Sequence, residues 1–188
     1  MEAFLVSTGI VALAEMGDKT QLLALILAAR FKKPWPIVAG ILVATLVNHA
    51  LAGAAGAWVT TLISPQMLRW ILAASFLAMA AWMLVPDKID ADEDEKPPRY
   101  GVFLTTVLVF FLAEMGDKTQ IATVMLAARY DAIVSVVAGT TLGMMLANAP
   151  VVWFGDKLVK RVPIRIVHTV SALVFAALGV AALWPLLY

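Results

Sequence analysis

The sequence has no cysteine, only two histidines, and charged side chains at only 14% of its 188 positions. Without cysteine there are no disulfides and no thiolate ligands, so soft-metal binding through sulfur would depend on methionine alone. A net charge of +1 offers no basic surface to nucleic acid. The scarcity of charge reflects a chain that is 62% hydrophobic, with a mean hydropathy of +0.90. A soluble domain would carry about 25% charged residues, so this is an integral membrane protein.

Long apolar stretches account for most of the chain. A membrane-spanning helix needs about 20 mainly apolar residues. Six stretches meet this requirement, at residues 3–29, 34–60, 67–85, 101–128, 132–154 and 164–187. The first stretch contains Glu15 and Asp18 and has no basic leader, so we interpret it as a retained helix and not as a secretory signal. The predicted fold class is an all-α membrane protein with six transmembrane helices.

Lysine and arginine are distributed unevenly when the six helices are threaded alternately through a bilayer. One side has only Arg69 and Arg129. The other side has Arg30, Lys32, Lys33, Lys88, Lys96, Arg99, Lys157, Lys160, Arg161 and Arg165. The side rich in positive charge is normally cytoplasmic. We therefore expect both termini to lie outside the cell, with the lipid bilayer as the surrounding partner.

One polar motif occurs twice inside the apolar stretches. Residues 13–21 and residues 112–120 both read LAEMGDKTQ, at an offset of 99 positions, and LAAR at 27–30 recurs at 126–129. We predict a duplicated three-helix unit, residues 1–85 and 101–188, forming one transport domain. An acidic cytoplasmic linker, residues 86–100, joins the units. Because three is odd, the second unit enters the membrane from the opposite face, which gives the inverted repeat typical of secondary transporters.

Each motif places carboxylates where a bilayer makes them costly. Such acids persist mainly where they face a bundle interior or an aqueous cavity. In an unbroken helix the Glu, Asp and Gln of each motif share one face, and we expect the two motifs to meet near the membrane centre. Oxygen ligands without thiolate or imidazole suit hard cations such as Ca²⁺, Mn²⁺ or Mg²⁺. The predicted metal ligands are Glu15, Asp18, Gln21, Glu114, Asp117 and Gln120.

Two lysines reduce the formal charge of the four motif acids to −2, which would balance one divalent cation. Lys19 follows Glu15 by four residues, so we expect these two side chains to pair when the site is empty. Burial favours the protonated form of a carboxylate, which gives cation/proton exchange a mechanism. Gly17 and Gly116 would permit a helix break, and the sequence leaves open whether one occurs.

Further polar residues are assigned supporting or proton-coupling roles. They are Lys19, Lys118, Thr20, Thr119, Asn48, His49 and Asn148. In an unbroken helix Thr20 would point away from the acids and bond back to a carbonyl of the preceding turn. For Asn48, His49 and Asn148 the alternative role is hydrogen bonding between helices.

Both motifs match the doubled E-x-G-D-[KR]-[ST] pattern, and the chain resembles the cation transporter family that has this pattern. The family includes Golgi manganese and calcium transporters of eukaryotes and manganese exporters of bacteria. The resemblance covers nearly the whole chain, including six helices and a central acidic loop. It implies cation/proton antiport of Mn²⁺ or Ca²⁺, with the cation as substrate, no cofactor, and the motif acids as ligands. The short leader is similar to bacterial members, which implies manganese efflux across the cytoplasmic membrane.

Two other functions remain open from the residues. An exporter of a small organic cation, such as an amino acid, could use the acids to bind an ammonium group. An intramembrane aspartyl protease could pair Asp18 with Asp117, although the accompanying Glu, Lys and Gln suit ion coordination better. The linker is expected to be a solvated connection, with cation sensing as the alternative. One chain contains both half-sites, so the path needs no second subunit, and the oligomeric state is left open.

Overall fold

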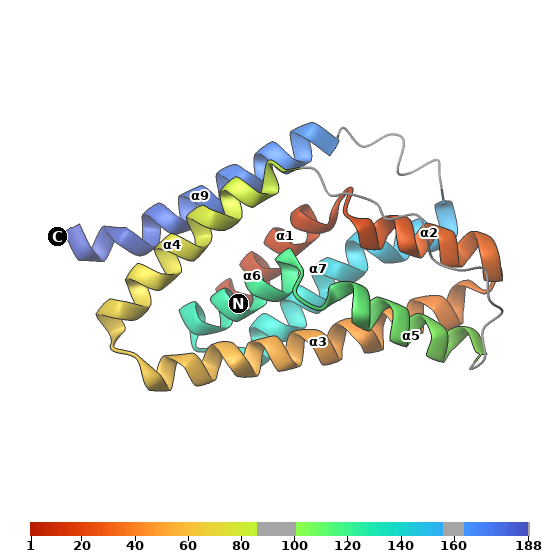
Figure 1. Ribbon diagram of the computed structural model, residues 1–188, viewed down its shortest axis with the longest axis horizontal. Coiled ribbons are helices and arrows are strands. Elements are labelled where there is room, and N and C mark those ends of the chain that lie inside the picture. Colours follow the sequence, from red (N-terminus) through yellow and green to blue (C-terminus); the bar gives the residue numbers. More distant parts are fainter. Residues whose placement is uncertain (86–100, 156–163, 188) are drawn as a thin grey trace.

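The computed structural model describes residues 1–85, 101–155 and 164–187, and every regular element within these ranges is a helix (Figure 1). The helices are α1 (Glu2–Glu15), α2 (Lys19–Phe31), α3 (Pro34–Leu62), α4 (Pro65–Met83), α5 (Gly101–Glu114), α6 (Lys118–Tyr130), α7 (Ile133–Phe154) and α9 (Ile164–Leu187). The all-α prediction is confirmed for these residues. The predicted linker at 86–100, and the basic residues expected at 157–161, lie outside the described residues.

The first and fourth predicted spans are each divided into two helices. α1 ends at Glu15 and α2 begins at Lys19, while α5 ends at Glu114 and α6 begins at Lys118. Gly17 and Gly116 lie between these helices, with φ angles of +84° and +75°. Glycine adopts such left-handed conformations without the steric cost of a Cβ. Both motifs therefore break their helices at the same point.

The breaks change how many helices could cross a bilayer alone. Among the described residues, four helical segments are long and apolar enough: α3, α4, α7 and residues 165–184 of α9. α1 and α2 have 14 and 13 residues. At 1.5 Å per residue each is about 20 Å long, which is shorter than a hydrocarbon core of about 30 Å.

The two broken helix pairs run antiparallel to each other. Figure 1 shows α1 and α2 following the long axis in one direction and α5 and α6 following it in the opposite direction. α1 packs on α7, and α5 packs on α3, which also contacts α6 and α7. α4 and α9 pack side by side, and this pair contacts α6 and α1.

Small residues allow the close contact between α1 and α7. A Cβ atom added at Gly143 would lie 2.6 Å from the carbonyl oxygen of Thr8, and one at Gly139 would lie 2.5 Å from that of Phe4. Larger side chains at these two positions would push α7 away from α1. This packing holds α7 against the helix that ends in the first motif.

The outer surface of the helical bundle is apolar, as its core is. Large hydrophobic side chains are exposed along α3, α4, α7 and α9, including Leu51, Trp70, Leu146 and Leu173. A soluble protein rarely exposes continuous apolar surface on this scale. Lipid is the solvent that suits such a surface, which supports the membrane assignment.

Candidate cation site

Carboxylates from both motifs converge between the two helix breaks. Glu15, Glu114 and Asp117 each offer an oxygen atom, and these atoms all lie within 4.8 Å of one another. Their exposed fractions are 0%, 1% and 5%, and Asp18 is equally buried at 4%. The acids of two segments 99 positions apart therefore form one buried cluster, as the duplication predicts.

The two motif lysines pair across the repeats. Lys19 Nζ lies 2.9 Å from Asp117 Oδ1, and Lys118 Nζ lies 3.8 Å from Asp18 Oδ1. The expected pair of Lys19 with Glu15 is wrong, because the break at Gly17 removes the helical turn that would have brought the two together. Each lysine instead neutralises an aspartate of the other motif.

The motif threonines bind the glutamates. Thr20 Oγ1 donates to Glu15 Oε2 at 2.6 Å, and Thr119 Oγ1 donates to Glu114 Oε2 at 3.0 Å. The expectation that Thr20 points away from the acids is wrong, because it assumed an unbroken helix. Both hydroxyls hold one oxygen of a glutamate in a defined position.

The motif glutamines hold the helix breaks in place. Gln21 Oε1 accepts from the Gly17 backbone N–H at 3.0 Å, and Gln120 Oε1 accepts from that of Gly116 at 2.7 Å. The break removes the helical partners of these N–H groups, one part-buried and one exposed, and the glutamine oxygens replace those partners. The Gln21 amide also donates to the Ala147 carbonyl of α7 at 3.0 Å. A ligand role for the two glutamines stays a prediction.

Polar residues of α3 and α7 surround the cluster. Asn148 Nδ2 lies 3.4 Å from Glu15 Oε2, and it also donates to the Met144 carbonyl. Asn48 binds the Phe111 carbonyl of α5 at 3.1 Å and accepts from Gln120 at 3.4 Å. His49 is buried, and within the described part of the chain its ring nitrogens have no hydrogen-bond partner.

Two neighbours of the site were missed by the sequence analysis. Met144 Sδ lies 2.9 Å from Asn148 Nδ2, and its position one helical turn before Asn148 was the available signal. The Trp82 ring centroid lies 5.9 Å from Lys118 Nζ. The sequence contains no pattern that pairs Trp82 of α4 with Lys118. Only the packing of the helices brings these two residues together.

Several oxygens of the cluster have no donor. Glu15 Oε1, Glu114 Oε1, Asp117 Oδ2 and Asn148 Oδ1 are buried and have no hydrogen-bond partner among the described residues. Such groups are rare in folded proteins, and each costs about 1–3 kcal/mol. A hard cation or protons would satisfy them.

An apolar helical bundle with a buried, cross-paired cluster of oxygen ligands has the features of a membrane transporter of hard cations. Comparison with known proteins specifies the family. The chain belongs to the family described as divalent cation/proton antiporter GDT1, whose model matches residues 3–91 and again residues 102–187. The protein is therefore a transporter, and the protease and organic-cation alternatives are wrong.

The relatives come from bacteria and plants. The chain is 49% identical over 182 residues to a Vibrio cholerae protein named "Putative manganese exporter", covering 96% of this chain and 90% of the relative. It is 29% identical to GDT1-like protein 3 of Arabidopsis thaliana, covering 96% and 70% of the two chains. It is 27% identical to a GDT1-like protein of Synechocystis, covering 98% of both. No solved structure matches the chain.

Proposed function

We propose that this protein exports cytosolic Mn²⁺ in exchange for protons, with Ca²⁺ as the second candidate substrate. The main support is the set of buried carboxylate oxygens at the meeting point of both motifs, for which the described part of the chain supplies no donor. Oxygen ligands favour Mn²⁺, Ca²⁺ and Mg²⁺ over softer metals. The name of the Vibrio cholerae relative favours manganese among these.

The proposed ligands are the four motif acids, Glu15, Asp18, Glu114 and Asp117. Three of them already have oxygens within 4.8 Å of one another, a spacing that a single ion could bridge. Gln21 and Gln120 are proposed to contribute only if they release the glycine N–H groups that they now bind. Asn148 borders Glu15, and we assign it a supporting role with Asn48 and His49.

Cation and protons are proposed to compete for the same oxygens. Lys19 neutralises Asp117, so an incoming divalent cation must displace this ammonium group. Protonation of the carboxylates would discharge the cation, and their deprotonation would restore the ligands. Thr20 and Thr119 keep each glutamate oriented through both steps.

The proposed membrane arrangement has six crossings in two inverted repeats, residues 1–85 and 101–188. The opposite directions of the α1–α2 and α5–α6 pairs support it (Figure 1). The two family matches also begin 99 positions apart, at residues 3 and 102. With the basic residues inside, both termini lie outside the bacterial cytoplasmic membrane, and the acidic linker is cytoplasmic.

Cation-driven proton movement tests the proposed function. The purified protein is placed in liposomes with a pH-sensitive dye, and Mn²⁺, Ca²⁺, Mg²⁺ and Zn²⁺ are added in turn. We expect Mn²⁺ to drive the largest flux and Glu15→Gln to abolish it. Glu2→Gln, a change of the exposed glutamate on the same helix, is the matched control and should retain flux. Equal flux in the Glu15→Gln and wild-type proteins would show that the motif glutamate is not needed for transport and would contradict the proposed mechanism.

A further inference from the structure

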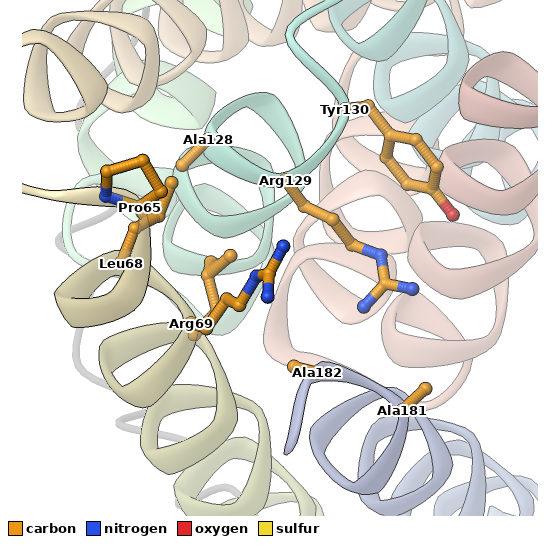
Figure 2. Close-up of a pocket in the computed structure, with 9 residues that line it drawn as sticks. Pro65, Leu68, Arg69, Ala128, Arg129, Tyr130, Ala181 and Ala182 are labelled. Atoms are coloured by element: carbon orange, nitrogen blue, oxygen red, sulfur yellow. The ribbon is translucent and has the colours of Figure 1, made fainter. Parts of the chain in front are cut away.

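A cavity of about 460 Å³ lies between α4, the end of α6 and α9, away from the cation cluster. Its lining includes Arg69 at the start of α4 and Arg129 at the end of α6. Figure 2 shows both side chains directed toward the space between these helices. None of the motif acids or lysines lines this cavity. Whatever it binds is therefore held by groups separate from the transport site.

Within the described ranges, the two guanidinium groups have no carboxylate partner. Among the described residues, no carboxylate lies within salt-bridge distance of Arg69 or Arg129. Arg129 is held by its own surroundings, because its Nη1 donates to the Leu178 carbonyl of α9 at 3.5 Å and its guanidinium lies 5.5 Å from the Tyr130 ring centroid. Two positive groups turned into one space repel each other unless an anion lies between them.

Apart from Tyr130, whose hydroxyl donates to Glu2 Oε1 at 3.4 Å, the rest of the lining is apolar. Leu72, Ala128 and Ala182 contribute to its lining and are nearly inaccessible, with exposed fractions of 6%, 7% and 7%. Two tryptophans are close in sequence to lining residues: Trp70 follows Arg69, and Trp184 lies shortly after Ala182. They are 55% and 62% exposed, as interfacial tryptophans commonly are. An anionic head with an apolar body would match both parts of the lining.

The placement of these arginines is unusual for the predicted topology. Arg69 and Arg129 are the two basic residues on the side where positive charge is otherwise depleted. They belong to different repeats and lie 60 positions apart in the sequence, yet they line one cavity. A common ligand explains why both are present.

We propose that this cavity binds a phosphate group, supplied by the headgroup of an anionic phospholipid in the outer leaflet. The guanidinium fork matches phosphate oxygens and can donate two parallel hydrogen bonds. The apolar lining accepts the start of an acyl chain. Bound lipid then connects the α4–α9 pair to α6, and this role does not depend on which cation is transported.

Lipid binding by the detergent-purified protein tests this assignment. The dissociation constant of short-chain phosphatidylglycerol is measured for the wild type and for Arg69→Gln, Arg129→Gln and the double variant. Each single change should weaken binding at least about tenfold. Arg30→Gln is the matched control, because it removes the same charge at the equivalent position of the other repeat and should leave binding unchanged.

Inorganic phosphate distinguishes the two sources of the ligand. If millimolar phosphate competes with the lipid in an Arg69-dependent manner, the phosphate group alone is recognised. If phosphate does not compete while the lipid binds, the acyl chain is also required. Both results support the site. The Arg69→Lys and Arg129→Lys variants, which keep the charge but lose the fork, serve if a glutamine variant fails to fold. Wild-type affinity in the double variant, or no lipid binding by the wild type, would overturn the proposal.

Discussion

At the residue scale, the site depends on which groups hold each carboxylate. One oxygen of each motif glutamate accepts from a threonine, while the other has no donor within the described residues. This division leaves one oxygen oriented and the other available to a ligand. The acids themselves could be predicted from the duplicated motif. The roles of the threonines and lysines could not, because their directions depend on the helix break.

Thr119→Val tests the orienting role of the hydroxyl. It keeps the side-chain shape and removes the 3.0 Å hydrogen bond to Glu114. A hydrogen bond to a charged group is worth about 1.5–3 kcal/mol. We expect Mn²⁺ affinity, measured by equilibrium binding, to fall by about tenfold or more. Thr169→Val, an exposed threonine of α9, is the control, and equal affinities in both variants would contradict the role.

At the element scale, the decisive feature is the break in each motif helix. The ends of the helical stretches were predictable, since apolar stretches are visible in the sequence. The break was not, because glycine fits both a continuous helix and a turn. What favours the break here is the set of replacement partners, in which each motif glutamine binds the N–H group of the preceding glycine.

Gly116→Ala tests whether the break is required. A Cβ at Gly116 would meet no atom within 4 Å, so the cost comes from the φ of +75° alone, about 1–2 kcal/mol. We expect a lower Tm in detergent and reduced transport. Gly9→Ala in α1 is the matched control, because its Cβ also has space and its helical backbone suits alanine. If Gly116→Ala raised the Tm as much as Gly9→Ala, the left-handed turn would be refuted.

At the scale of the whole molecule, the odd number of predicted spans per repeat predicted opposite directions for the two motif segments, and Figure 1 shows α1–α2 and α5–α6 running in opposite directions. The packing of α4 against α9 was not predictable, because both helices are apolar around most of their surface. That pair creates the arginine-lined cavity, which therefore had no signal in the sequence beyond two isolated basic residues.

The absence of cysteine makes the membrane orientation directly testable. Gln66 lies in the first turn of α4, Lys33 lies between α2 and α3, and both side chains are exposed. The test uses the single variants Gln66→Cys and Lys33→Cys. A membrane-impermeant maleimide should label position 66 in intact cells and position 33 only after permeabilisation. The cysteine-free wild type provides the background, and the reverse labelling pattern would invert the proposed topology.

We propose that acids of both repeats hold a single cation. Equilibrium dialysis of the purified protein against Mn²⁺ measures the number of ions bound per chain. We expect one ion per chain. Binding should be lost in the Glu15→Gln variant and also in the Glu114→Gln variant, because each repeat supplies ligands to one shared site. Two ions per chain in the wild type, with one remaining in each single variant, would mean two separate sites and would contradict the shared site.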